Sequence, residues 1–204
     1  MGIPGSLLRK MILRTFLTKL PSKKSNYYRN MIPVRQPYSA TCYINYEYRE
    51  GVMKDLIKKI FSTEDAIGLS IARITLAVVF IPHGAQKLLG LFGGHGFSGT
   101  MNFFTSSGMP VLVAFLVIMA ESLGALALLF GFIGRFMALG IFMVMNGAIF
   151  MVHLKNGFFM NWMGTQKGEG FEFHLLALGL ALIVMLKGSG KFSIDRLISK
   201  KFLK

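Results

Sequence analysis

The segment AIGLSIARITLAVVFIPHGAQKLLGL, which runs from residue 66 to about residue 91, is apolar over the length that a membrane-spanning helix needs. About 20 residues of α-helix cross the ~30 Å hydrocarbon core of a bilayer. Similar segments follow at residues 110–131, 136–154 and 171–186, the last of them shorter than the others. The sequence therefore predicts four transmembrane helices. The fourth can cross where the bilayer thins locally or where Lys187 reaches back to its surface.

We expect helices rather than barrel strands, because lipid leaves exposed backbone groups unsatisfied and the apolar runs lack a two-residue alternation. The expected fold class is an all-α integral membrane four-helix bundle over residues 66–187. Residues 53–65 form a cytoplasmic lead-in and residues 188–204 a basic cytoplasmic tail. Lys and Arg are far more frequent near the helix ends on the side of the termini, so both termini are expected to be cytoplasmic. The expected location is the cell inner membrane, crossed several times.

Composition excludes a soluble domain and a nucleic-acid-binding protein. Of the 204 residues, 53% are hydrophobic and 16% are charged, whereas soluble domains carry about 25% charged residues. Much of the net charge of +14 lies outside the apolar segments, which favours contact with anionic lipid headgroups, and no nucleic-acid-binding fold accompanies it. The single cysteine, Cys42, allows no intrachain disulfide and no cysteine-bound metal cluster. Electron transfer by this chain would need an organic cofactor or haem.

Residues 1–52 differ in composition from the rest of the chain. They contain all six tyrosines and the only cysteine, and they are strongly basic. Three interpretations stay open. They are a non-native extension ahead of a translation start at Met53, a basic arm lying on the membrane, or an organelle transit peptide.

Two charged residues inside the apolar segments each need a partner or a function, because an unpaired charge in a membrane is costly. Arg73 lies about two turns into the first segment, and Glu121 lies midway along the second. In antiparallel helices their depths differ by roughly 6 Å, at a rise of about 1.5 Å per residue, which an arginine side chain can bridge. We expect an Arg73–Glu121 pair, either as a clamp between helices or as part of a ligand or proton site. Separate roles for the two residues stay open.

A second group of polar side chains is expected near one level, toward the non-cytoplasmic side. Histidines and a carboxylate at similar depth could bind a quinone carbonyl, move protons, or hold a metal or haem. No pair has the HxxxH or HxxE spacing of a metal site on one helix, so no metal ligands are assigned. Interfacial histidines without a ligand remain the alternative. The group consists of His83, Lys87, His153, Glu172 and His174.

Three stretches resemble the DoxX family of small four-helix membrane proteins. They are PHGAQKLLG (residues 82–90), which follows Arg73, AESLGALALLFG (residues 120–131), which precedes Gly134 and Arg135, and GSGKFSIDR (residues 188–196). The order and spacing of these stretches make the resemblance specific, and it covers about residues 64–197. Residues 1–52 match nothing in the family pattern.

The resemblance implies an inner-membrane subunit of the kind associated with thiosulfate:quinone oxidoreductase. The implied function is a quinone-linked oxidoreductase subunit that binds a small molecule near the non-cytoplasmic side and works with a partner redox subunit in the lipid bilayer. Quinone is the expected cofactor, ahead of haem. The alternative is a non-enzymatic small-solute permease or a membrane assembly scaffold, and neither activity nor oligomeric state is assigned. The candidate catalytic residues are His83, Glu121 and Arg73, and the candidate cofactor-binding residues are His83, Lys87, Glu172, His174 and His153.

Overall fold

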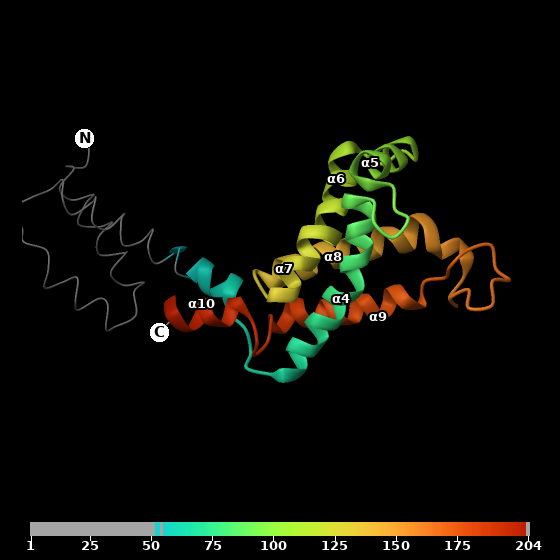
Figure 1. Cartoon of the computed structure of the whole chain (residues 1–204). Coiled ribbons are helices and arrows are strands. Elements are labelled where there is room, and N and C mark those ends of the chain that lie inside the picture. Colours follow the sequence, from blue (N-terminus) through green and yellow to red (C-terminus); the bar gives the residue numbers. More distant parts are fainter. Residues whose placement is uncertain (1–51, 54, 203–204) are drawn as a thin grey trace, which may run out of the picture. The chain divides into compact units, whose positions relative to one another are not determined.

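The computed structural model describes residues 52, 53 and 55–202, and this part of the chain is helical and contains no strand (Figure 1). The labelled helices belong to one compact unit, Lys54–Lys204. In chain order they are α4 (Ile67–Leu89), α5 (Gly96–Ser106), α6 (Val111–Met119), the π-helical turn η1 (Ala120–Gly124), α7 (Ala125–Phe130), α8 (Gly134–Ala148), the π-helical turn η2 (Ile149–His153), the 3-10 turn η3 (Leu154–Asn156), α9 (Glu172–Lys187) and α10 (Ile194–Phe202). The expected all-α class is confirmed. The interpretations of residues 1–52 concern residues that, except for Val52, lie outside the described range.

Three of the predicted spans are confirmed as helices long and apolar enough to cross a membrane. They are Ile67–Leu89, Val111–Phe130 (α6, η1 and α7) and Gly134–Asn156 (α8, η2 and η3). Each has at least 20 residues, which is about 30 Å at a rise of about 1.5 Å per residue. α9 has 16 residues and is shorter than these three.

The hydrophobic core joins α9 to the three long helices. Small side chains such as Ala125, Ala138 and Ala181 are fully buried in it and let the helices approach closely. α9 packs mainly against α8 and α4. The core residues are Leu76, Ala77 and Phe80 of α4, Ala125 and Leu128 of α7, Ala138, Ile141 and Met145 of α8, and Ala177, Ala181 and Val184 of α9.

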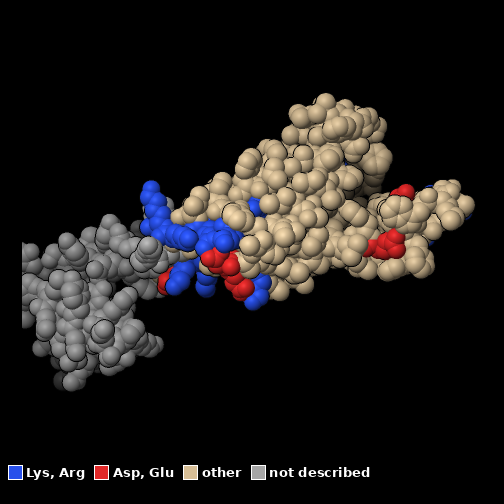
Figure 2. Space-filling view, turned by 60° about the horizontal axis from the view of Figure 1, so that its bottom comes forward, with Lys and Arg blue, Asp and Glu red and all other residues tan. Residues whose placement is uncertain are grey.

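Three helices were not predicted, one of them at residues 55–61 in the expected lead-in. α5 follows the first span and ends before Pro110, and α10 lies in the expected basic tail. Figure 1 shows α5 and α6 at the top of the unit and α10 at its left. In Figure 2 the Lys and Arg residues of the visible face gather at the α10 end, and the long middle part carries almost no charged residue. A charge-free band between charged ends is the pattern expected for a protein embedded in a bilayer.

Candidate functional site

An ion pair between Lys87 and Glu121 forms the centre of the candidate site. The Lys87 ammonium on α4 lies 2.5 Å from Glu121 Oε2 on η1. The Lys87 side chain is 22% exposed, whereas that of Glu121 is only 5% exposed. A charge buried as deeply as Glu121 needs a partner, because removal from water costs several kcal/mol. The pair therefore holds one ammonium group at the edge of the packed helices.

Glu121 faces Lys87 because the second span is locally rewound. The π-helical turn η1 changes the direction in which its side chains point, and such turns occur frequently at functional sites. At this level α4 carries Gly84, whose missing side chain lets the two backbones touch. A Cβ atom on Gly84 would overlap the carbonyl oxygen of Glu121 and would lie 2.5 Å from Ser122 Cα. Close backbone contact at Gly84 thus brings Lys87, three residues later, within reach of Glu121.

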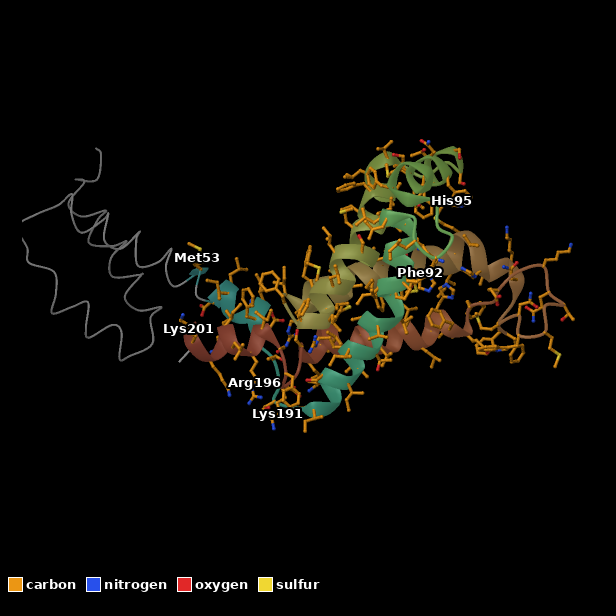
Figure 3. All side chains as sticks on the ribbon, in the orientation of Figure 1. Met53, Phe92, His95, Lys191, Arg196 and Lys201 are labelled. Carbon is orange, nitrogen blue, oxygen red and sulfur yellow. The ribbon has the colours of Figure 1, made fainter. Side chains whose placement is uncertain are left out.

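A cavity of about 280 Å³ opens beside Lys87, where α4, the loop after it and α5 meet. Its volume lies just below the usual range of ligand sites, about 300–1,000 Å³, so it suits a small group rather than a large molecule. Its walls combine polar groups, including Lys87, with two aromatic rings. The lining residues are Gln86, Lys87, Gly93, Gly94, His95, Thr100, Phe103 and Phe104. Figure 3 shows His95 near the start of α5, beyond the end of α4.

Sequence analysis missed the α5 side of this cavity. A short helix outside the long apolar segments leaves no span-length hydropathy signal, and Thr100, Phe103 and Phe104 form no recognisable motif. A signal that could have pointed to the site is the run Gly93-Gly94-His95-Gly96. Its Gly94 packs directly on the Gln86 backbone, which a Cβ atom would overlap.

Arg73 is not the partner of Glu121, so the prediction of an Arg73–Glu121 pair is wrong. Arg73 is 1% exposed, and among the described residues its guanidinium donates hydrogen bonds to four backbone carbonyl oxygens and to no side chain. Two of these oxygens lie at the carboxyl end of α7, and the other two lie in the segment after α9. They are Leu128 O, Leu129 O at 2.5 Å, Phe192 O at 2.6 Å and Ser189 O at 2.9 Å. A cation at the carboxyl end of a helix satisfies its free carbonyl groups and its dipole.

Asp195 complements Arg73 at the neighbouring helix end, and sequence analysis had not assigned it a role. It is 1% exposed, and its carboxylate accepts hydrogen bonds from the free amides at the start of α8, Ile133 N at 2.7 Å and Gly134 N at 2.9 Å. Ser189 Oγ donates a third bond at 2.6 Å. Between the two charged residues, Gly131 turns the chain with φ of 67°, a conformation that favours glycine. Arg73 and Asp195 together clamp the α7–α8 hairpin.

His153 and His174 come together at the far ends of α8 and α9. Their ring centroids are 4.1 Å apart, and His153 lies in the second π-helical turn, η2. His153 Nδ1 lies 2.8 Å from Glu169 O. His174 is 6% exposed, and its Nδ1 has no hydrogen-bond partner among the described residues.

Glu172 organises the loop between α8 and α9. It is the first residue of α9, and its Oε1 accepts hydrogen bonds from Met160 N at 3.1 Å and from Trp162 Nε1 at 3.3 Å. Its position at the start of the helix explains how Glu172 can face the loop while His174, two residues later, faces inward.

The seven predicted site residues therefore form separate groups. In the described part of the chain no ion pair, hydrogen bond or ring contact joins Lys87 and Glu121 to His153 and His174. His83 is exposed on α4, lies 6.1 Å from Phe80 between ring centroids, and is not among the residues that line the cavity. Within residues 55–202 no group of three or more His, Cys, Asp or Glu side chains is arranged to hold a metal ion.

Three known proteins are similar to this chain over about two thirds of its length, and two of them are named inner membrane proteins. The Escherichia coli (strain K12) inner membrane protein YqjF is 32% identical over 138 residues, which is 67% of this chain and 95% of YqjF. The Bacillus subtilis (strain 168) protein named "Putative oxidoreductase CatD" is 29% identical over 134 residues, 66% of this chain and 89% of CatD. The inner membrane protein YphA of Escherichia coli (strain K12) is 29% identical over 142 residues, 67% of this chain and 94% of YphA.

The family model named DoxX matches residues 68–154, which include Arg73, the Lys87–Glu121 pair and the cavity. No solved structure matches the chain. The predicted location in the inner membrane is confirmed by these relatives together with the three membrane-spanning helices. The match to YqjF covers 95% of that protein at 32% identity, and the family model matches residues 68–154 of this chain. This chain is therefore a multi-pass inner membrane protein and belongs to the DoxX family.

Proposed function

We propose that the chain is a membrane subunit of a quinone-linked oxidoreductase and that the cavity beside Lys87 binds a quinone head group. One observation carries this proposal: an ammonium group, held on a buried carboxylate, stands at the wall of a small cavity that also contains two phenyl rings. A quinone needs a hydrogen-bond donor for a carbonyl oxygen and a flat apolar surface for its ring, and the lining supplies both. The oxidoreductase name of a relative from Bacillus subtilis is consistent with this reaction class.

Each residue of the site has a definite task in this proposal. Lys87 donates a hydrogen bond to a quinone carbonyl oxygen, and Glu121 holds the Lys87 ammonium in place. Phe103 and Phe104 contact the ring, and Thr100 offers a second polar contact. A bound quinone supplies the capacity to accept electrons and protons.

The first test is a titration of the purified protein with a short-chain ubiquinone analogue, followed by calorimetry. Lys87→Gln is expected to weaken binding roughly tenfold or more, because a hydrogen bond from a charged donor contributes about 1.5–3 kcal/mol. Phe104→Ala is expected to weaken it through loss of ring contact. Lys155→Gln removes an exposed lysine of η3 that does not line the cavity, and it should bind as the wild type does.

The same titration tests the prediction that His83 binds the quinone. Because His83 lies outside the cavity lining, His83→Ala should change the affinity little. Strong loss in His83→Ala together with unchanged binding in Lys87→Gln would contradict the site proposed here.

The alternative function is that of a non-enzymatic permease or assembly scaffold. It is supported by the structural contacts of Arg73 and Asp195, which hold helix ends and are not among the residues that line the cavity beside Lys87. A folded wild-type protein that binds no quinone analogue would favour this alternative.

We further propose that α9 forms a fourth crossing and that both termini are cytoplasmic. α9 contributes three residues to the shared core, and the chain after it is basic. Lys167 precedes α9 and Lys200 follows it. With Cys42 replaced by serine, a membrane-impermeant maleimide should label Lys167→Cys in cells with an intact inner membrane. It should label Lys200→Cys only after that membrane is opened. Labelling of both positions from the same side would show that α9 does not cross.

A further inference from the structure

The outer face of α10 and of the segment before it combines apolar and basic side chains. Phe192 is 64% exposed, Ile194 38% and Leu197 69%. Lys191 and Lys200 are exposed beside them, and the Lys191 ammonium lies 5.8 Å from the centroid of the Phe192 ring. Leu197 and Lys200 are three residues apart and are therefore neighbours on the helix surface. We call these five residues the α10 face.

The start of α10 is fastened to the body of the protein. The buried Asp195 carboxylate binds the amides of Ile133 and Gly134, and Asp195 N donates a hydrogen bond to Gly131 O at 2.9 Å. These three partners form the turn between α7 and α8, which is the point where two membrane-spanning helices meet the aqueous phase. α10 is therefore held at the level of a membrane surface rather than on a free tail.

The charge that α10 presents outward is positive. The only acidic residue of the helix, Asp195, is buried and satisfied by its amide and hydroxyl donors. Arg196 forms an ion pair with Asp65, so it fastens the helix and adds little to its outer charge. Figure 3 shows Lys191, Arg196 and Lys201 at this end of the unit, and Figure 2 shows that basic side chains gather at the same end.

We propose that α10 lies on the bilayer surface and binds anionic phospholipid headgroups. Lys191 and Lys200 contact the phosphates, while Phe192 and Leu197 enter the boundary between headgroups and acyl chains. Helices with an apolar side and a basic side bind membranes in this way, and each lysine near an anionic surface contributes about 1 kcal/mol. We expect the lipid surface to be the binding partner because Asp195 fixes α10 beside the ends of two membrane-spanning helices. The inference does not depend on quinone binding.

The test follows the depth of Leu197 in the full chain reconstituted into vesicles. Leu197→Trp is introduced together with Trp162→Phe, which removes the single native tryptophan. Vesicles contain either phosphatidylcholine alone or equal parts of phosphatidylcholine and phosphatidylglycerol. The expected result is a shorter emission wavelength and stronger quenching by brominated acyl chains in the anionic vesicles.

Two charge variants make the test specific. Lys191→Gln with Lys200→Gln is expected to lower the ratio of bound to unbound α10 roughly tenfold or more in the anionic vesicles. Lys155→Gln with Lys167→Gln removes the same charge from the loop between α8 and α9 and should leave the ratio unchanged. A tryptophan equally exposed to water in both vesicle types would overturn the proposal. A tryptophan equally buried in both vesicle types would also overturn it. So would an equal loss of α10 binding in the two double charge variants. An unchanged thermal midpoint in each variant shows that the fold is retained.

Discussion

Replacing Arg73 by methionine is expected to prevent the accumulation of folded protein. The side chain is 1% exposed and donates to four carbonyl oxygens, two of them at the end of α7. Two of these bonds, to Leu128 O and Ser189 O, are buried, and each buried acceptor left without a donor costs about 1–3 kcal/mol, so the loss amounts to about 2–6 kcal/mol. The Asp195 carboxylate would also lose its nearby counter-charge. Because whole proteins are stable by only about 5–15 kcal/mol, this loss is a large part of the total.

The measurement compares the amount of monodisperse protein extracted from membranes and its unfolding in a denaturing detergent. Arg196→Gln is the matched control, because it removes an arginine whose ion pair with Asp65 lies at the surface. Such pairs contribute about 1 kcal/mol or less. An Arg73→Met protein as abundant and as stable as the control would show that the carbonyl contacts do not hold the hairpin.

Replacing Gly84 by alanine is expected to destabilise the protein by roughly 1–3 kcal/mol and to weaken quinone binding. The added Cβ atom would overlap the Glu121 carbonyl oxygen and lie 2.5 Å from Ser122 Cα. Both are backbone atoms, which cannot rotate away as a side chain can, so α4 and η1 must separate. Overpacking of this kind typically costs about 1–3 kcal/mol. Separation also draws Lys87 away from Glu121, since Lys87 is three residues from the contact.

Gly179→Ala on α9 provides the control for this change. No atom lies within 4 Å of a Cβ at Gly179, and alanine favours helix by about 1 kcal/mol over glycine. Unfolding in a denaturing detergent should show Gly84→Ala to be less stable than the wild type and Gly179→Ala to be more stable. The quinone titration should show weaker binding in Gly84→Ala alone. Equal stability of Gly84→Ala and Gly179→Ala would contradict the prediction, because α4 and η1 would then separate at Gly84 without loss of free energy.

The spans could be predicted from the sequence because they depend on length and composition. The segment predicted at residues 66–91 forms α4 over Ile67–Leu89, and the segment at residues 171–186 forms α9 over Glu172–Lys187. The helix α5 could not be predicted in the same way. It is short and lies outside the long apolar runs, so its position depends on contacts with α4 and α6.

The partner of Glu121 shows why the site was harder to predict. Depth arithmetic indicated that Arg73 could reach Glu121, but depth does not specify how each helix is turned about its axis. Fourteen residues separate Arg73 from Lys87, so both lie on one face of α4, near its opposite ends. The π-helical turn directs Glu121 to Lys87, and Arg73 binds carbonyl oxygens that every residue possesses and no sequence pattern reveals.

The sequence by itself determined the all-helical class, the membrane location and the family. The helical class and the membrane location follow from the free energy of transferring residues into lipid, which adds up along a segment whatever its neighbours are. The family follows from the order and spacing of the stretches at residues 82–90, 120–131 and 188–196. Only the tertiary structure decided which group satisfies each buried charge, where the cavity opens and how α10 is anchored. These features depend on the rotation of helices and on backbone contacts such as that at Gly84, which arise only when distant segments pack together.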